Sequence, residues 1–209
     1  MNETANENPV WKPAVDDMAD RGFVFVHINK TGGSSIRAAL DISGYQHVRA
    51  CDIAAFLGWR KWSEMTTFST IRNPWDRLVS MYYWRVTTNQ TGLADSRIDF
   101  NDWLDLCLRR RDPYFIKNPL MLAPQSYWLC DESGELLVDR LLRFERLAED
   151  FHKLCAAIGI QKKAELPHLK KTERKHYSAY FGQKDAELVG RIYKKDIEAF
   201  GYRFDGEPA

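Results

Sequence analysis

The segment Asn29-Lys30-Thr31-Gly32-Gly33-Ser34-Ser35 collects the residue types that bind a phosphate group. It lies between an apolar run at 23–28 and a stretch of helical composition at 36–40, so the pattern predicts a strand, a turn and a helix. A helix N-terminus offers backbone N–H groups and a positive dipole end, to which Lys30 adds a cation. The glycine pair would keep side chains away from the anion. The segment predicts a phosphate cradle, although a glycine turn with surface hydroxyls is the alternative. It is not a Walker A loop, because Lys30 precedes both glycines.

A second turn of the same kind follows some forty residues later. Residues 67–72 predict a strand, after which Asn73 caps a helix, Pro74 takes its first position and Asp76 is placed as a capping carboxylate. Arg72 would lie at the end of the strand, with Ser80 two helical turns further on. A guanidinium fork and a hydroxyl could hold a second phosphate. The alternatives are an Arg72–Asp76 ion pair and a packing role for Ser80.

Strands that alternate with helices predict a mainly parallel sheet with helices on both faces. Ligands of such sheets bind beyond the carboxyl ends of the strands, where both turns would lie. The chain has 209 residues and shows no linker or repeat after residue 20, so we expect one domain over 21–209. Residues 1–20 are polar and interrupted by prolines, which predicts a flexible N-terminal arm.

Composition excludes several classes of protein. Thirty basic residues against 29 acidic ones give a net charge of +1, which argues against a nucleic-acid-coating protein. No apolar run approaches the length of a membrane span, and the N-terminus lacks the features of a secretory signal. The cysteines are scattered and form no metal-ligand pattern, so we expect reduced thiols packed in a cytoplasmic protein without a metal. They are Cys51, Cys107, Cys130 and Cys155.

The two turns together identify a family resemblance. FVHINKTGGSSI followed by STIRNPWDRLVSMYYW resembles the carbohydrate O-sulfotransferases of sulfotransferase family 2, and most closely the soluble bacterial type that is similar to heparan and chondroitin sulfotransferases. The resemblance continues through PQSYWLCDESGELLVDRLLRFERLAEDF and LPHLKKTERKHYSAYF, and it covers nearly everything after Gly22. It implies a P-loop-like three-layer α/β fold and the donor 3′-phosphoadenosine 5′-phosphosulfate (PAPS).

The resemblance also implies roles for individual residues. In the family the first motif holds the 5′-phosphosulfate, and the matching residues are Lys30, Thr31, Gly32, Gly33, Ser34 and Ser35. The second holds the 3′-phosphate, and the matching residues are Arg72 and Ser80. The run 161–175 has an excess of four positive charges and is similar to the family's cofactor-covering loop, which makes Lys171, Thr172 and Arg174 candidates for phosphate contacts. A solvated face is the alternative for this run. Asn29 departs from the proline that many relatives have.

Sulfuryl transfer to a hydroxyl needs in-line positioning, stabilisation of negative charge and a base. Lys30 would stabilise the charge. His47 lies in GYQHVRACDIAAFLG, which is similar to the family segment that contains the catalytic histidine. His27, on the strand entering the cradle, is the second candidate for the base. Either residue could instead be a hydrogen-bonded structural histidine.

These observations predict a PAPS-dependent sulfotransferase that acts on a hydroxyl of a sugar, a glycan or a related acceptor. A P-loop-like kinase for a nucleotide or small metabolite and a non-catalytic nucleotide-binding protein are the alternatives. The sequence does not name the acceptor or the oligomeric state. Aromatic side chains that could stack on a sugar, but could equally belong to the core, are Trp59, Trp62, Trp84, Trp103 and Tyr127.

Overall fold

A computed structural model of the chain describes residues 10–44, 47–96, 98–160, 166 and 174–205. These residues belong to two compact units. The first comprises Met1–Ile71 and Tyr127–Leu169, and the second comprises Arg72–Ser126 and Lys170–Ala209. The fold is mixed α/β, with a parallel sheet flanked by helices, as expected of a P-loop-like protein.

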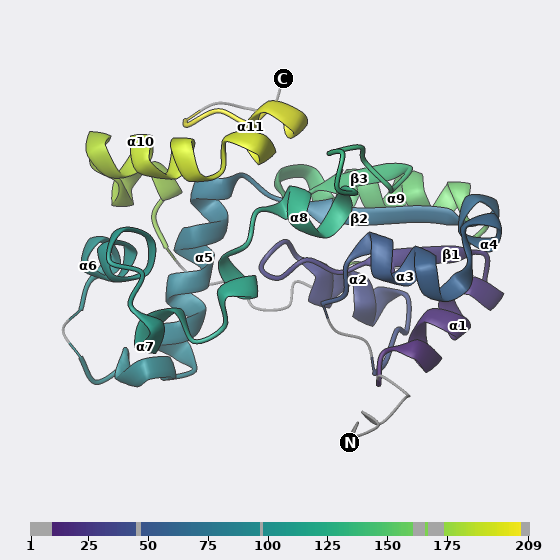
Figure 1. The fold of residues 1–209 in the computed structure, drawn as a ribbon, viewed down its shortest axis with the longest axis horizontal. Helices are drawn as coiled ribbons and strands as arrows, with labels where there is room; N and C mark the ends of the chain where they lie inside the picture. Colours follow the sequence, from purple (N-terminus) through teal and green to yellow (C-terminus); the bar gives the residue numbers. More distant parts are fainter. Residues whose placement is uncertain (1–9, 45–46, 97, 161–165, 167–173, 206–209) are drawn as a thin grey trace, which may run out of the picture. The chain divides into compact units, whose positions relative to one another are not determined.

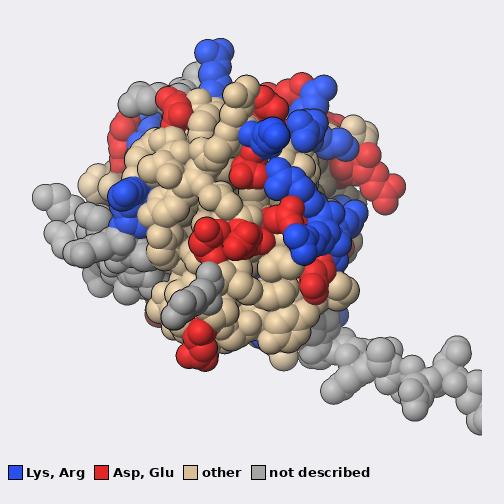
Figure 2. Space-filling view, turned by 90° about the vertical axis from the view of Figure 1, so that its left-hand side faces the viewer, with Lys and Arg blue, Asp and Glu red and all other residues tan. Residues whose placement is uncertain are grey.

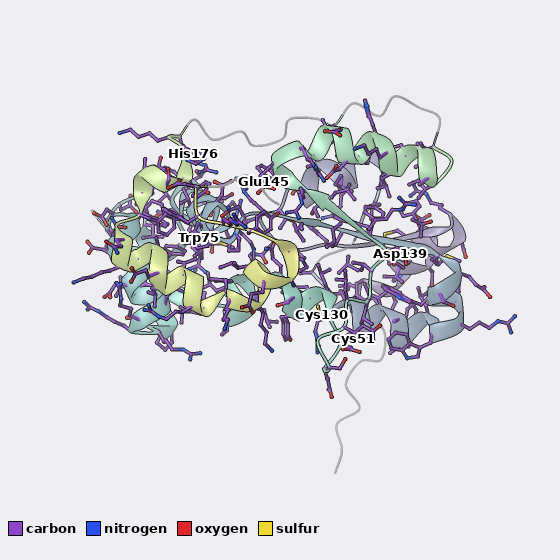
Figure 3. All side chains as sticks on the ribbon, turned by 90° about the horizontal axis from the view of Figure 1, so that it is seen from above. Cys51, Trp75, Cys130, Asp139, Glu145 and His176 are labelled. Atoms are coloured by element: carbon purple, nitrogen blue, oxygen red, sulfur yellow. The ribbon has the colours of Figure 1, made fainter. Side chains whose placement is uncertain are left out.

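The sheet of the first unit has the strand order β1-β2-β3, and both neighbouring pairs are parallel (Figure 1). The strands are β1 (Phe23–Val26), β2 (Thr66–Ile71) and β3 (Arg140–Arg143). All four side chains of β1 are buried, because helices cover both faces of a parallel sheet. Asp139, labelled in Figure 3, fixes the register of β3 against β2: its carboxylate accepts hydrogen bonds from the backbone N–H and the hydroxyl of Thr67, both at 2.8 Å.

Two layers of helices enclose this sheet. Helix α3 (Ala50–Leu57) lies on one face and α9 (Leu147–Ala157) on the other (Figures 1 and 3). Phe25 and Phe68 stack in the core with ring centroids 5.1 Å apart. The first unit also contains α1 (Lys12–Asp20), α2 (Gly33–Ala39) and α4 (Trp59–Glu64), and α8 (Gln125–Leu129) begins just before its second segment.

The expectation of a flexible N-terminal arm over 1–20 is wrong for residues 12–20, which form α1. Pro13 suits the first turn of this helix, since it needs no N–H donor there. The buried residues follow helical spacing and pack next to β1; they are Ala14, Val15, Met18 and Ala19. The polar residues around them hide this spacing in the sequence. Residues 1–9 lie outside the described part.

The second unit, as far as it is described, is helical. Its helices are α5 (Pro74–Thr87), α6 (Phe100–Leu104), α7 (Pro113–Ile116), α10 (Gln183–Ile192) and α11 (Lys194–Phe200), and a π-helical turn spans Asp105–Arg109. One core joins α5, α6 and α10 through buried side chains such as Trp75, Trp103 and Tyr193. Short 3-10 turns are at Gln90–Gly92, Pro119–Leu122, Phe144–Arg146 and Tyr177–Tyr180, the third of them in the first unit.

Across the described helices of both units, none has the length and apolar character that a membrane crossing requires.

Candidate functional site

The turn after β1 has the predicted order of strand, turn and helix. β1 ends at Val26, and α2 begins at Gly33. Lys30 and Gly32 both adopt left-handed backbone conformations, with φ of 64° and 90°. The N–H of Ser35 donates to the carbonyl of Gly32 at 3.0 Å, which closes the first turn of the helix. Because the first N–H groups of a helix have no intrahelical acceptor, this turn can present them to an anion.

The glycine pair has a structural role within the protein itself. A Cβ on Gly32 would lie 2.8 Å from Cδ2 of Leu147, and a Cβ on Gly33 would lie 2.1 Å from Cδ2 of His27. Both distances are far below a normal contact. The glycines therefore make room for side chains of the protein, and Gly32 also supplies the positive φ.

Thr31 turns its hydroxyl inward. Its Oγ1 donates to the carbonyl of Ile28 at 2.8 Å and lies 2.6 Å from Oγ1 of Thr70, and the residue is fully buried. The hydroxyl thus ties the turn to β2. Of the two serines in the motif, Ser34 is exposed and Ser35 is half-buried, so both hydroxyls are nearer the surface.

The two histidines proposed as bases pack against each other. The ring centroids of His27 and His47 are 4.5 Å apart, and Nδ1 of His47 lies 3.0 Å from the backbone carbonyl of His27. A carbonyl only accepts hydrogen bonds, so Nδ1 of His47 carries the proton and the lone pair of the neutral ring is on Nε2. This is the tautomer that a general base requires.

His27 has a different environment. It is only 7% exposed, and its Nδ1 is buried without a hydrogen-bond partner among the described residues. Burial, followed by the nearby His47 and Arg37, lowers the pKa of His27 well below its usual range. His27 is therefore neutral at pH 7, and its ring packs against that of His47.

Sequence reasoning missed the neighbours of His47. Trp128 packs edge-on against it at 6.1 Å between centroids, and Tyr127 packs against Trp128. The guanidinium carbon of Arg49 lies 4.6 Å from the Tyr127 ring, and Nε of Arg49 donates to the Tyr127 carbonyl at 3.1 Å. Arg49 and Tyr127 are far apart in the sequence, so no local sequence pattern predicts this contact.

Of the aromatic residues considered for sugar stacking, Trp59 and Tyr127 are exposed. Trp84 is half-buried, whereas Trp62 and Trp103 belong to the core. The structure thus leaves Tyr127 as the exposed aromatic side chain in the cluster that contains His47.

In the second unit, Arg72 and Asp76 form the ion pair that was an alternative in the sequence. Nε and Nη2 of Arg72 lie 2.8 and 2.7 Å from Oδ2 of Asp76. Arg174 pairs with Oδ1 of the same carboxylate. Asn73 caps α5 as predicted, with its Oδ1 accepting from the N–H of Trp75 at 3.1 Å. Asp76 lies in the first turn of α5, where a capping carboxylate was expected, and the two arginines engage both of its oxygens.

The main chain of Arg72 is also held, by a side chain that the sequence did not single out. Gln125 accepts from the N–H of Arg72 and donates to its carbonyl, both at 2.8 Å. The carboxylate of Asp196 accepts from the N–H groups of Gln125 and Ser126 at 2.6 and 2.8 Å. Gln125 and Asp196 are fully buried, so they fix Arg72 from inside the unit.

Ser80 is half-buried on α5, one helical turn beyond Asp76 and two beyond Arg72. Within α5 the spacing puts Asp76 and Ser80 on one face, and Arg72, which precedes the N-cap Asn73, joins them through its ion pair with Asp76. Of the candidates in the basic run 161–175, Arg174 is placed as above. Lys171 and Thr172 lie outside the described residues.

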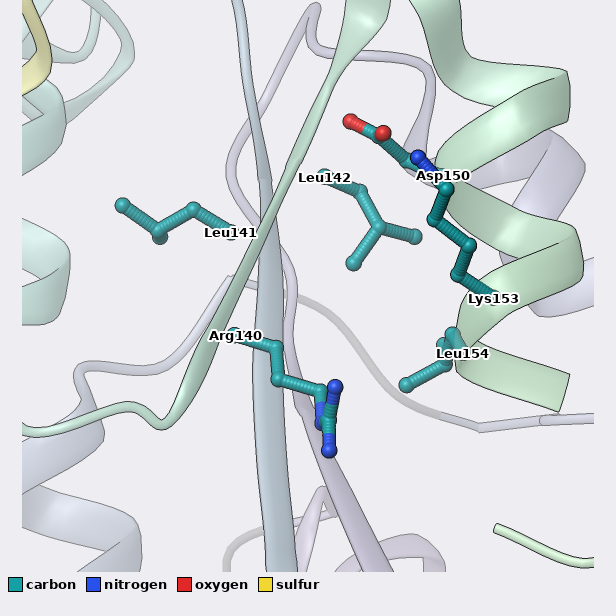
Figure 4. Close-up of a pocket in the computed structure, with 6 residues that line it drawn as sticks. All are labelled: Arg140, Leu141, Leu142, Asp150, Lys153 and Leu154. Atoms are coloured by element: carbon teal, nitrogen blue, oxygen red, sulfur yellow. The ribbon is translucent and has the colours of Figure 1, made fainter. Parts of the chain in front are cut away.

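One cavity contains none of the predicted site residues. A cavity of about 230 Å³ lies between β3 and α9, lined by Arg140, Leu141, Leu142, Asp150, Lys153 and Leu154 (Figure 4). On the face viewed in Figure 2, basic and acidic side chains are interspersed. Within the described ranges, no three His, Cys, Asp or Glu side chains gather as a metal site would require, and all four cysteines are thiols.

A parallel sheet whose first strand runs through a glycine-containing turn into a helix is typical of P-loop-like α/β proteins. Comparison with known families gives the particular class: residues 16–203 match the model of the sulfotransferase family. The match covers most of the chain, so the protein belongs to this family and is a transferase of sulfuryl groups. No curated protein and no solved structure matches the chain.

Proposed function

We propose that this chain transfers the sulfuryl group of PAPS to a hydroxyl of a sugar or glycan acceptor, with His47 as the general base. The observation that carries the proposal is the hydrogen bond from Nδ1 of His47 to the carbonyl of His27, within a chain of the sulfotransferase family. That bond selects the tautomer in which Nε2 can accept a proton.

The residues present fit the two anionic ends of such a donor. The turn at 30–35 combines a lysine, two serines near the surface and the first N–H groups of α2, which suits a phosphosulfate. Arg72 and Arg174 converge on one carboxylate, so their guanidinium groups are already close enough to share an anion, which suits the 3′-phosphate. Ser80 adds a hydroxyl on the same helix face as Asp76. The proposal also includes Lys171 and Thr172, which precede Arg174 in the sequence, as contacts to the phosphates of the donor.

When bound, PAPS supplies an activated sulfuryl group and a phosphate leaving group. Nε2 of His47 takes the proton from the acceptor hydroxyl as the new O–S bond forms and the S–O bond to the leaving phosphate breaks. The resulting imidazolium keeps its Nδ1–H bond to the His27 carbonyl, which stabilises the positive charge. Lys30 and the N–H groups of the turn stabilise the negative charge on the leaving phosphate.

The test is transfer of labelled sulfate from PAPS to a panel of glycans, lipids and small alcohols, combined with thermal unfolding. We expect 3′,5′-ADP to raise the melting temperature, because a ligand at 100 times its Kd adds about 2.7 kcal/mol. ATP with Mg²⁺ should have little effect. Stabilisation by ATP with Mg²⁺ alone would instead support a kinase, and binding of 3′,5′-ADP with no transfer to any acceptor would support a non-catalytic protein.

Variants separate the roles. His47→Ala should abolish most turnover with unchanged affinity for 3′,5′-ADP, whereas Lys30→Ala should lower both. His152 is exposed on α9, so His152→Ala is the matched control and should behave like the wild type. Full activity of His47→Ala between pH 6 and 8 would transfer the role of base to His27.

A further inference from the structure

Asp76 joins two arginines that are far apart in the sequence. Its Oδ2 accepts from Nε and Nη2 of Arg72 at 2.8 and 2.7 Å, and its Oδ1 pairs with Nη2 of Arg174. The three side chains are 7%, 14% and 14% exposed, in the order Arg72, Asp76, Arg174. They form a buried cluster of two cations and one anion.

The carboxylate in this cluster is ionised at neutral pH. Burial alone would raise the pKa of Asp76, but the charges of Arg72 and Arg174 and their hydrogen bonds outweigh burial, and the pKa is lowered. Each oxygen therefore carries charge and engages a different guanidinium group. Because a guanidinium is planar, a carboxylate that engages its Nε edge also fixes the direction of its other N–H groups.

The cluster lies at the second of the two phosphate sites that the sequence predicts, the one assigned to Arg72 and Ser80. Asp76 follows Arg72 by four residues and precedes Ser80 by four, so it lies between them at the start of α5. Without its carboxylate, the two guanidinium groups would lose the anion that they share. Such an arrangement is costly and leads side chains to rotate apart.

We propose that Asp76 is a positioning residue, which holds Arg72 and Arg174 as one pair for the 3′-phosphate of the donor. The inference rests on the proposed function, since it concerns the same site. Asp76 acts through the two arginines and does not itself contact the phosphate. Its negative charge opposes phosphate binding, so the proposal requires that orientation of the arginines outweighs this repulsion.

The experiment measures how much the 3′-phosphate contributes to binding. Calorimetric Kd values for 3′,5′-ADP and 5′-AMP are compared in each variant, because the two nucleotides differ only in that phosphate. In Asp76→Asn, the amide can accept from only one arginine and directs N–H donors at the other. We expect the ratio of the Kd of 5′-AMP to the Kd of 3′,5′-ADP to fall by about tenfold, which corresponds to about 1.4 kcal/mol. The Kd of 5′-AMP should be unchanged, so the fall would come from weaker binding of 3′,5′-ADP.

Asp105 provides the matched control in the same unit. It also bridges two arginines, with Arg109 at 3.3 Å and Arg110 at 2.7 Å, but it lies on a more exposed turn. Asp105→Asn should keep the wild-type ratio. If Asp76→Asn does not fold, as judged by circular dichroism, Asp76→Glu and Asp105→Glu form a second pair: the longer side chain shifts the carboxylate, so the ratio should fall severalfold in the first and stay unchanged in the second.

The outcomes separate this inference from the function itself. An unchanged ratio in the Asp76 variants would show that the carboxylate does not position the arginines. A higher ratio would show that Asp76 competes with the phosphate, which also overturns the inference while leaving the function intact. A wild-type protein that binds 5′-AMP as tightly as 3′,5′-ADP would overturn the 3′-phosphate assignment together with the inference.

Discussion

Replacing Gly33 by alanine tests whether the packing of His27 determines the geometry of the turn. A Cβ at this position would lie 2.1 Å from Cδ2 and 2.4 Å from Nε2 of His27. Carbon atoms in favourable contact are about 3.5–4.0 Å apart, so the imidazole must move by more than about 1 Å. It has little room, because it stacks on Phe25 at 5.5 Å and against His47 at 4.5 Å between centroids.

The expected cost combines two opposing effects. Overpacking a buried site costs about 1–3 kcal/mol. Alanine in place of glycine in a helix returns about 1 kcal/mol. We therefore expect Gly33→Ala to lower the free energy of unfolding by up to about 2 kcal/mol, measured by urea denaturation. A displacement of about 1 Å next to His47 should also lower turnover by about a hundredfold, measured with labelled PAPS.

Gly190→Ala is the matched control. Gly190 lies inside α10, and a Cβ there would meet Cζ2 of Trp75 at 3.6 Å, an ordinary contact. The same substitution should therefore stabilise the protein by about 0.5–1 kcal/mol and leave turnover unchanged. If Gly33→Ala is as stable and as active as the wild type, the His27 ring is not confined as described and the argument for the turn fails.

Three further predictions concern caps, buried hydrogen bonds and pH. Asn73→Ala removes the cap of α5 and the hydrogen bonds from Nδ2 to the Arg203 carbonyl and the Tyr177 hydroxyl, and should lower stability by about 1–2 kcal/mol in urea unfolding. Asn73→Asp keeps the cap but loses the Nδ2 donor, so it should recover only part of this loss. Gln125→Leu leaves the N–H and carbonyl of Arg72 without their partner and should cost about 1–3 kcal/mol, with a weaker affinity for 3′,5′-ADP but not for 5′-AMP. Since the pKa of His27 is lowered in the folded state, the unfolded chain binds the extra proton as pH falls below about 6.5, so stability should decline from pH 7 to pH 5. His27→Gln should reduce this slope, and His176→Gln, at an exposed position, should not.

The sequence predicted those parts of the fold that rest on local signals. The strand at β2 and the Asn73 cap follow from residue types within a few positions, and both are confirmed. The strand expected over 23–28 is shorter, ending at Val26, because His27 already turns into the loop. Leu188, Ile192, Asp196 and Phe200 lie at helical spacing, which predicts one last helix that ends at Gly201. The end is confirmed, but the segment forms two helices, α10 and α11, which meet at Tyr193, a break with no glycine or proline to mark it.

In the candidate site too, residues in local motifs could be predicted, whereas residues that act through distant partners could not. Lys30, Arg72 and Ser80 could be proposed from the sequence because their motifs are contiguous. Arg49, Trp128 and Gln125 could not, because each acts through a partner distant in the chain, and their residue types are common in ordinary structure. His47 lies between these cases: the resemblance suggested it, but the tautomer that suits a base depends on the carbonyl of His27, which only the fold brings near.

The arginines of the second unit have two kinds of partner, and the difference bears on whether they serve stability or ligand binding. Arg77 donates to the carbonyl of Ala123 at 2.8 Å, and Arg85 to that of Ile116 at 2.9 Å, so both satisfy backbone groups where the chain leaves regular structure. Burial lowers the pKa of both guanidinium groups, as it does for cations held mainly by neutral acceptors. Arg72 and Arg174 instead share the carboxylate of Asp76, an arrangement that apolar residues of similar size could often replace without loss of stability. The cluster is therefore weak evidence for a role in stability, and it agrees with the proposal that Arg72 and Arg174 bind an anion.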